Sequence, residues 1–418
     1  MFAGALLLAT LPTAFAAGAP FGLAVTLWLA FGAVAAGDLL MSSRRPPDLT
    51  IDHPPEIFVG ETVALTLSAS PAPPGLSARL AWPEGIEGPA QVELTGDAVP
   101  LPVRAVRRGA WSIDAIWLRW PTRLGLFEFV PRRRTDIRLR VVPNIRLIES
   151  GEITSTVQST LYGIKENRAL GEGSEFHQLQ DFVRGMDVKT IDWKRSARRR
   201  SLVAREMRAE RNHHVIVALD NGYLMRERIA GLPRIDHAVT AALATAWAAA
   251  IGGDLVGLFT FDTRPRLWVA PRGGRQAFAR LRSHTADLDY VSRETNHTLA
   301  LSELNARTPK RSLLIIFTDF VDTTSAELMV ENIAILARRH LVLFVTLRDP
   351  EMEAIAGTAP DDLDGAARIV AAAQSLDERR LVLERLTRLG VTVVDAEPGQ
   401  VTARLLARYL DITARGLI

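Results

Sequence analysis

The stretch His214-Val215-Ile216-Val217-Ala218-Leu219-Asp220-Asn221-Gly222 decides the fold of the C-terminal half of the chain. Its apolar run is rich in valine and isoleucine and shows no polar alternation, which is typical of a parallel strand buried on both faces. Asp220 follows the run directly, so it marks the carboxyl end of that strand. In open α/β sheets this is the edge at which ligands bind.

Outward from this stretch, apolar runs alternate with longer segments of helical character. The further predicted strands lie at 255–261, 313–317, 341–346 and 391–394, and the predicted helices lie around 235–251 and 325–339. This alternation is the βαβ pattern of a parallel sheet covered by helices. We therefore predict a doubly wound, Rossmann-like α/β domain over residues 212–418.

Acidic and hydroxyl side chains follow three of these predicted strands. Asp220 follows the first, Asp262 the second, and Thr318 with Asp319 the third. Because the carboxyl ends of parallel strands meet at one edge, we expect these side chains to share one rim of the sheet. Their oxygens suit a divalent cation, but an Asp at a strand end also commonly caps the next helix. Both interpretations remain open at this point.

A different pattern occupies residues 46–144, where short runs with a period of two are separated by clusters of Pro and Gly. For example, Ile137, Leu139 and Val141 alternate with arginines. Such a pattern indicates strands with one buried and one wet face, and we predict an all-β, Ig-like sandwich. The three arginines at 132–134 are expected at a solvated hairpin tip, with contact to anionic lipid or to a partner as the alternative.

The N-terminal segment is apolar and carries no Asp, Glu, Lys, Arg or His before Asp38. As one helix its 37 residues would extend for ~55 Å, against a hydrocarbon core of ~30 Å. Pro20 falls in the middle and favours a turn. We therefore predict a membrane anchor over residues 1–43 that consists of two short transmembrane helices, at about 1–17 and 21–37.

Arg44 and Arg45 follow the second predicted span directly, and clustered arginines beside a span mark its cytoplasmic side. We therefore expect an inner-membrane protein with the residues after Arg45 in the cytoplasm. A cleaved signal peptide is the competing interpretation, since Ala14-Phe15-Ala16 resembles a cleavage site, but no positively charged region precedes it. A start upstream of Met1 also stays open, because no charge flanks that residue.

Composition excludes several classes of protein. The chain has 418 residues and a net charge of +3, which argues against a polybasic nucleic-acid-binding protein. It contains no cysteine, and therefore no disulfide, thiolate zinc site, iron–sulfur cluster or cysteine nucleophile. Phosphate-loop, His-Glu-x-x-His and Gly-x-Ser-x-Gly motifs are also missing.

Residues 145–211 connect the two predicted domains. Ile153, Val157, Leu161 and Ile164 recur at helical spacing and predict one amphipathic linker helix. The rest of the connection, which we call the signature segment, carries a specific set of motifs: Gly173-Ser174-Glu175-Phe176-His177-Gln178-Leu179, Gly185, Asp187, Ile191-Asp192-Trp193-Lys194, Ser196-Ala197-Arg198 and Arg205-Glu206.

With these motifs the chain resembles the bacterial family catalogued as domain of unknown function 58. The paired spans and the β segment, with its Arg108-Gly109 and its Leu-Gly-Leu-Phe at 124–127, are similar to the family as well, so the resemblance covers nearly the whole chain. Gln180 and Met186 depart from the family pattern, in which an arginine and an acid are usual.

The resemblance implies a von Willebrand factor A-like C-terminal domain. In such domains a metal-ion-dependent adhesion site consists of an Asp-x-Ser-x-Ser motif, a threonine and a second aspartate. Asp220, Thr295 and Asp319 match the aspartates and the threonine, but Gly222 and Leu224 stand where the two serines belong. The loss of two hydroxyl ligands predicts weak or absent Mg²⁺ binding, and no other cofactor is expected.

Four interpretations of the arginine-rich stretch at 181–211 compete. Internal ion pairs hold an irregular loop with Trp193 buried as its anchor, or the stretch docks an acidic partner, or it contacts lipid, or it binds nucleic acid. The last is disfavoured because no aromatic ladder interleaves with the arginines. For partner binding we single out Glu175, Phe176, Asp187, Asp192, Trp193, Lys194, Ser196, Arg198 and Glu206.

The leading hypothesis is a non-enzymatic, membrane-anchored cytoplasmic scaffold. The resemblance implies a MoxR-type AAA+ ATPase as its partner, bound through the rim and the signature segment in assembly or maturation of other complexes. One alternative is a metal-dependent enzyme with Asp220, Asp262 and Asp319 as ligands, and another is a module that senses a lipid surface. No nucleic-acid partner is expected, and the oligomeric state stays open.

Overall fold

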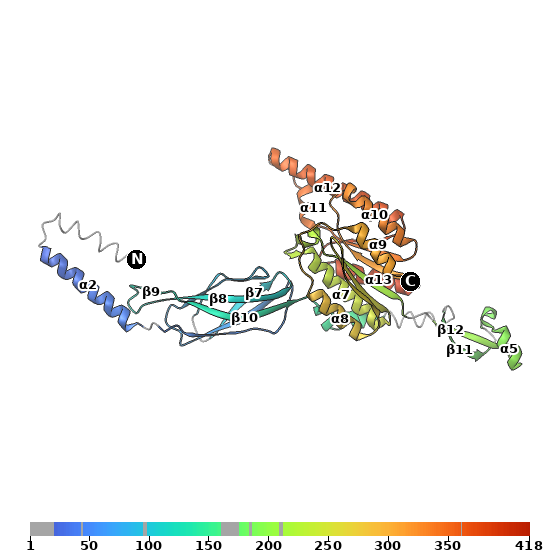
Figure 1. The fold of residues 1–418 in the computed structure, drawn as a ribbon, viewed down its shortest axis with the longest axis horizontal. Helices are drawn as coiled ribbons and strands as arrows, with labels where there is room; N and C mark the ends of the chain where they lie inside the picture. The colour runs from blue at the N-terminus through green and yellow to red at the C-terminus, as the bar shows by residue number, and fades with distance from the viewer. Residues whose placement is uncertain are drawn as a thin grey trace. The chain divides into compact units, whose positions relative to one another are not determined.

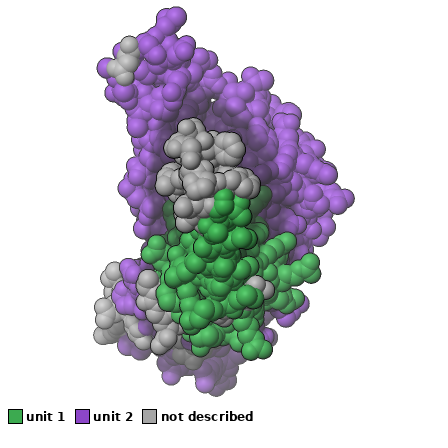
Figure 2. Space-filling view, turned by 90° about the vertical axis from the view of Figure 1, so that its left-hand side faces the viewer, with its two compact units in different colours: residues 1–142 green, residues 143–418 purple. Residues whose placement is uncertain are grey.

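The computed structural model describes residues 21–42, 45–94, 98–159, 175–183, 186–208, 212–360 and 362–418. The chain divides into two compact units, Met1–Val142 and Pro143–Ile418, which Figure 2 shows in different colours. Each unit has a buried apolar core of its own.

The first described element is an apolar helix, α2 (Phe21–Met41). It contains the second predicted span and continues through Asp38, whereas the first predicted span lies outside the described residues. Among the described helices, α7 (Arg234–Gly252) is long and apolar enough to cross a membrane by composition, but 72% of its apolar window is buried inside the fold. The comparable stretch of α2, Trp28–Met41, is shorter. The described residues thus carry one apolar N-terminal helix, and a two-helix hairpin is not established.

A β domain follows α2 and is built from two sheets. The first sheet has the order β1-β3-β7-β5, formed by β1 (Asp48–Asp52), β3 (Thr62–Ser70), β7 (Val99–Ala105) and β5 (Ile86–Glu87). The second has the order β2-β10-β8-β4-β6 with β9 paired to β8, formed by β2 (Ile57–Phe58), β10 (Arg132–Val142), β8 (Gly109–Pro121), β4 (Ser77–Leu80), β6 (Gln91–Glu93) and β9 (Glu128–Phe129).

The buried faces of these strands follow the period of two in the sequence. Leu65 and Leu67 on β3, like Leu101 on β7, are fully buried and alternate with more exposed neighbours. Ile113 on β8 is also fully buried. Alternate side chains therefore form the core of the β domain, as expected for strands with one buried and one wet face.

The arginine run at 132–134 forms the start of β10, which corrects the expectation of a solvated hairpin tip. Arg132 pairs in register with Trp117 on β8, and its guanidinium lies 5.6 Å from the centre of that ring. Arg133 contacts Asp48 of β1 at 3.2 Å. Cross-strand pairing with β8 extends β10 through this run. Three consecutive arginines are tolerated in a strand because their long side chains can lie along the sheet while their charged ends stay in water.

The second unit begins with α3 (Arg146–Glu149) and a helical stretch at 152–159. Ile153 and Val157 are buried there, as the predicted amphipathic helix requires, whereas Leu161 and Ile164 lie outside the described residues. Trp247 of α7 donates a hydrogen bond from Nε1 to Thr154 Oγ1 at 3.2 Å. The linker helix therefore packs on the α/β domain.

The described part of the signature segment forms a small ribbon with two short helical elements. Strand β11 (Glu175–Asp181) pairs antiparallel with β12 (Val203–Arg208), and between them lie η1 (Val188–Thr190) and α5 (Trp193–Arg199). Ser196 of α5 is buried, and its hydroxyl accepts a hydrogen bond from the Val203 backbone N–H at 2.9 Å. This bond fastens α5 to the ribbon, so the stretch is more regular than the irregular loop considered above.

The α/β domain is built on a sheet with the order β17-β16-β13-β18-β19-β20. Its strands are β13 (His214–Asp220), β16 (Leu255–Phe261), β17 (Pro265–Arg272), β18 (Ser312–Phe317), β19 (Leu341–Leu347) and β20 (Thr392–Ala396). All neighbours are parallel except β17, which is an antiparallel edge. Counted along the chain, the order is 3-2-1-4-5-6, the doubly wound arrangement whose chain reversal lies between β13 and β18.

Two helical layers cover this sheet (Figure 1). α7 packs with α8 (Arg275–Ala286) and α13 (Val401–Arg415), and α10 (Thr323–Ala337) packs with α9 (His297–Arg307) and α12 (Leu363–Arg388). Shorter elements are α6 (Tyr223–Arg226), β14 (Arg228–Ile229), β15 (Leu232–Pro233) and α11 (Pro350–Ala356). The central strands β13 and β18 are buried along almost their whole length, as their unbroken apolar runs predict.

Candidate functional site at the strand ends

The predicted rim exists, and it lies where β13 and β18 end. Asp220 is the last residue of β13, and Thr318 and Asp319 follow β18 directly. Because these strands are hydrogen-bonded neighbours in a parallel sheet, their carboxyl ends meet at one edge. All three side chains are buried, with 4% or less of each residue exposed.

Asp220 is held by a complete set of neutral donors. Its Oδ1 accepts hydrogen bonds from the Gly222 N–H at 2.8 Å and from the Thr295 hydroxyl at 2.6 Å, and its Oδ2 accepts one from the Thr318 hydroxyl at 2.5 Å. His297 Nε2 lies 3.0 Å from Thr318 Oγ1 and 3.5 Å from Asp220 Oδ2. Since the single proton of Thr318 goes to Asp220, the imidazole N–H donates to Thr318.

Gly222 explains why the rim can close in this way. A Cβ atom added at Gly222 would lie 1.9 Å from Thr295 Oγ1, a distance that no real contact allows. The Thr295 hydroxyl therefore occupies the space that a serine at position 222 would need. The missing serine and the position of Thr295 are two parts of one packing arrangement.

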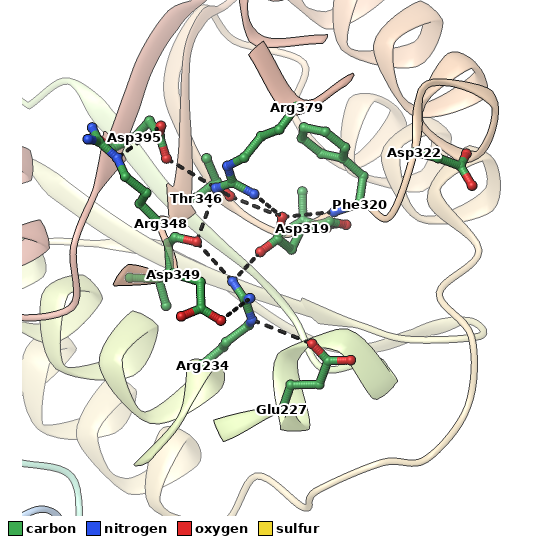
Figure 3. Close-up of polar contacts among 12 residues, drawn as sticks. Glu227, Arg234, Asp319, Phe320, Asp322, Thr346, Arg348, Asp349, Arg379 and Asp395 are labelled. Carbon is green, nitrogen blue, oxygen red and sulfur yellow. Dashed lines mark hydrogen bonds and ion pairs between the residues drawn. The ribbon is translucent and has the colours of Figure 1, made fainter. Parts of the chain in front are cut away.

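Asp319 is held by two arginines that come from distant parts of the chain (Figure 3). Arg234, at the start of α7, places Nη1 2.6 Å from Asp319 Oδ2, and Arg379 of α12 places Nη1 2.9 Å from Oδ1. Oδ1 also accepts the Phe320 N–H at 3.0 Å. The Asp319 side chain is 5% exposed, so both ion pairs are largely desolvated, and removal of either arginine would leave a buried charge poorly compensated.

Arg379 connects this site to the end of β20. Its Nη2 donates to Thr346 Oγ1 at 2.6 Å and to Asp395 Oδ1 at 3.1 Å, and its guanidinium lies 5.7 Å from the centre of the Phe320 ring. Burial by itself would lower the pKa of Arg379, but the attraction of Asp319 and Asp395 outweighs it and raises that pKa. Arg379 is therefore a permanently charged cross-link between the ends of β18, β19 and β20.

Asp262, at the end of β16, is engaged separately. It is fully buried and accepts a hydrogen bond from Arg266 Nε at 2.6 Å. The three carboxylates of the alternative enzyme hypothesis thus each have their own partners, and Asp319 already carries two cations. Among the residues described in the structure, no group of three or more His, Cys, Asp or Glu is placed to hold a metal ion. Each carboxylate of this rim is therefore already engaged by donors from the chain itself.

A hollow of about 500 Å³ is lined by Asp319 and by Thr295 and His297, the two residues that contact Asp220 or its partner Thr318. Its walls combine polar rim residues with apolar side chains of α10 and of the turn before it. Two of the apolar residues are well exposed, Val321 at 51% and Leu328 at 59%. Thr295, which also lines the hollow, is the residue that the resemblance matched to the threonine of the adhesion site.

Three residues of the rim were missed by the sequence analysis: Arg234, His297 and Arg379. None belongs to a motif, and each reaches the rim from a different helix. The signal that could have suggested Arg234 and Arg379 is the burial of Asp319 itself, since a buried carboxylate requires a cationic partner or several donors. Which of the chain's many arginines supplies the charge depends on the tertiary fold.

The residues singled out in the signature segment come together in the ribbon unit. Glu175 and Phe176 begin β11, and Glu206 lies on β12 in register with Gln178. The Asp187 carboxylate caps η1 by accepting the Lys189 N–H at 2.9 Å, and the Asp192 carboxylate caps α5 by accepting the Arg195 N–H at 3.1 Å. Asp187 and Asp192 therefore have local structural roles as helix caps.

Trp193 is 64% exposed, so the interpretation in which it is buried as an anchor is wrong. The buried residue of α5 is instead Ser196. Trp193 follows the cap Asp192 and occupies the first position of α5, while Lys194 and Arg198 are also exposed. The helix thus presents a tryptophan and an arginine, residue types enriched at binding hot spots, together with a lysine.

The fold and the rim define an α/β protein whose strand-end carboxylates are held by the chain's own donors, with a hollow of mixed polar and apolar lining beside them. Residues 178–369 match the model of a family described as "Protein of unknown function DUF58". The match confirms, over this segment, the resemblance seen in the signature motifs. No protein with a curated description matches the chain.

Several solved structures are distantly similar. The conserved hypothetical protein BatB from Bacteroides thetaiotaomicron is 15% identical over 49% of this chain and 100% of its own, with a TM-score of 0.34. An aerotolerance-related membrane protein from Bacteroides fragilis is 10% identical over 48% and 99%, with a TM-score of 0.30. The vWF domain of the type V pili tip protein Mfa5 from Porphyromonas gingivalis is 12% identical over 50% and 96%, with a TM-score of 0.27. The α/β fold of this domain is defined by the strand order of its own sheet.

Proposed function

We propose that this protein is a membrane-anchored scaffold whose C-terminal domain is of the von Willebrand factor A type and binds a protein partner. The hollow lined by Thr295, His297 and Asp319 is the binding surface, and it works without a metal ion. The observation that carries the proposal is a rim whose carboxylates already have hydrogen-bond or ion-pair partners, with exposed apolar side chains at its edge, Val321 and Leu328. Such a surface offers little for metal-dependent chemistry but suits protein contact.

The signature segment forms the second part of the proposed contact. Trp193, Lys194 and Arg198 are exposed on α5, and an exposed tryptophan with neighbouring cations suits an acidic partner. The family resemblance implies a MoxR-type AAA+ ATPase in this role. We place the protein in the inner membrane through its N-terminal apolar segment, with the residues after Arg45 in the cytoplasm, where such an ATPase would meet it.

The test is co-purification of the full chain, extracted in mild detergent, with a MoxR-type ATPase trapped in its ATP-bound state. Leu328→Asp places a charge on the wall of the hollow and should reduce recovery of the ATPase at least about tenfold, since burying an unpaired charge in an interface is costly. Ile335→Asp is the matched control, because Ile335 lies on the same helix with a similar exposure of 50% but does not line the hollow.

Recovery that is unchanged by Leu328→Asp, or lost equally with both variants, would refute the assignment of the hollow. Failure to recover any ATPase under trapping conditions would refute the partner class. Trp193→Ala tests the signature segment separately from the hollow, since it should reduce recovery of the ATPase while leaving the rim residues unchanged.

A further inference from the structure

The C-terminal end of α2 is fastened to the turn between β8 and β9 (Figure 1). Asp38 is 4% exposed, and its Oδ2 accepts the Thr122 hydroxyl at 2.5 Å while its Oδ1 accepts the Leu124 N–H at 2.9 Å. Ser42 accepts the Arg123 N–H at 3.0 Å. The first charged residue of the sequence is thus used to hold the apolar helix against one particular turn of the β domain.

This turn, residues 122–127, is a preformed structure. The Thr122 N–H donates to the Phe127 carbonyl at 2.8 Å, and the Phe127 N–H donates back to Thr122 Oγ1 at 3.0 Å. Gly125 has a φ of +71°, a conformation that favours glycine. These hydrogen bonds, including those of the buried Thr122 side chain, occupy the inside of the turn, while the Leu124 and Phe127 side chains are exposed.

The outward side chains are apolar, and they lie beside the end of an apolar helix. On the turn, Leu124 is 63% and Phe127 is 42% exposed, and in the last turn of α2, Leu40 is 75% and Met41 is 69% exposed. Where the turn meets the end of α2, these four large apolar side chains form a patch exposed to solvent, which is energetically unfavourable in water.

Cations accompany this patch. Arg45 and Arg123 are exposed close to it in sequence, and the nearby Arg119 and Glu128 neutralise each other at 2.7 Å. Apolar side chains with arginines beside them suit the interface of an anionic bilayer, where chains enter the acyl boundary and cations bind lipid phosphates. The patch continues directly from a helix that carries no charge before Asp38, so the same bilayer reaches both.

We propose that the turn 122–127 and the last turn of α2 form one surface that seats the β domain on an anionic bilayer. Leu124 and Phe127 enter the interface, Arg45 and Arg123 bind lipid phosphates, and the Asp38 hydrogen bonds fix the β domain relative to the helix. The inference concerns the first unit and does not depend on the partner proposed for the second.

The absence of cysteine from the chain allows a direct test. Single Leu124→Cys and Phe127→Cys variants of the full chain are labelled with an environment-sensitive fluorophore and placed in vesicles of phosphatidylglycerol and phosphatidylcholine. Glu84→Cys is the control, because its side chain is 78% exposed and it lies near the start of β8. The 13 residues of β8 separate that site from the turn by roughly 40 Å.

We expect labels at 124 and 127 to emit at shorter wavelength and to be quenched at least about twofold by doxyl-labelled lipid, while the label at 84 is quenched only by aqueous iodide. Asp38→Ala, Arg123→Gln or vesicles without phosphatidylglycerol should each reduce the lipid quenching at 124. Equal iodide quenching at 124 and 84 would overturn the proposal. So would shielding of 124 from iodide without quenching by doxyl lipid, since a protein would then cover the turn.

Discussion

At the scale of single residues, the positions of Gly222, Thr295 and Asp220 depend on one another. Gly222 leaves space that the Thr295 hydroxyl fills, and Thr295 then satisfies Asp220 at 2.6 Å. A serine restored at position 222 would displace Thr295 before it could act as a ligand. Asp319 is neutralised by Arg234 and Arg379, so the second aspartate of the rim is directed toward arginines. Both aspartates are thus held by partners that the chain itself supplies.

The buried arginine provides a prediction at this scale. Arg379→Leu leaves Thr346 without its arginine donor, Asp395 with only its 3.5 Å ion pair to Arg348, and Asp319 with one cation. We expect it to lower the free energy of unfolding of the α/β domain by about 3 kcal/mol. The measurement is the shift of that domain's transition in urea. Arg380→Ala, next along α12, removes an ion pair to Asp377 whose side chains are 67% and 70% exposed, and should cost less than about 1 kcal/mol. Equal costs for the two variants would show that the buried cross-link contributes nothing.

At the scale of elements, the signature segment derives its order from one side-chain contact and two caps. Ser196 binds the Val203 N–H, while Asp187 and Asp192 cap η1 and α5. The ribbon can therefore hold α5 in place while Trp193 stays exposed. Ser196, Asp187 and Asp192 thus stabilise the fold of the segment, whereas Trp193 remains exposed on its surface.

This division predicts different effects for neighbouring substitutions. Ser196→Ala leaves the buried Val203 N–H without an acceptor, and we expect faster hydrogen exchange of the β12 amides, corresponding to a loss of about 1–2 kcal/mol of local stability. Trp193→Ala should leave that exchange unchanged because the ring is 64% exposed. Exchange measured by mass spectrometry distinguishes the two. Faster exchange in both variants would mean that Trp193 also supports the ribbon.

At the scale of the whole molecule, the chain consists of two units with separate cores. The core of the α/β domain includes buried residues from Ile216 to Val391, with Phe259, Phe261 and Phe344 among the largest. The β domain buries its own alternate residues, such as Leu65 and Ile113. Each unit thus has the apolar interior that an independent domain requires.

It follows that residues 143–418 should fold without the rest of the chain. We expect this fragment to be monodisperse without detergent and to unfold cooperatively, with a midpoint within about 4 °C of the α/β transition in the full chain, a difference of about 1–2 kcal/mol. Calorimetry of both proteins provides the comparison. A fragment that lacks near-ultraviolet circular dichroism would indicate that the first unit is needed for packing.

Much of the α/β architecture could be predicted from local pattern. The runs at 215–219 and 313–317 lie in β13 and β18, and the predicted helices correspond to α7 and α10. The edge strand β17 was missed because half-buried residues leave no continuous apolar run. The pairing of Asp220 with Thr295 was anticipated only through the family resemblance. The arginines on Asp319 could not be foreseen, since they lie 85 and 60 residues away along the chain.

The sequence by itself determined where the apolar helix, the strands of the β domain and the buried parallel strands lie. The signals for these elements are the period of the apolar residues and the turn-forming Gly and Pro residues, and both are read within a few neighbouring residues. It also determined that acids stand at the strand ends. The tertiary structure decided what those acids do: it brought Arg234 and Arg379 to Asp319, filled the space at Gly222 with Thr295, and fastened Asp38 to the turn after β8. Charge neutralisation in a buried site depends on which distant groups meet there, and only the folded chain specifies that meeting.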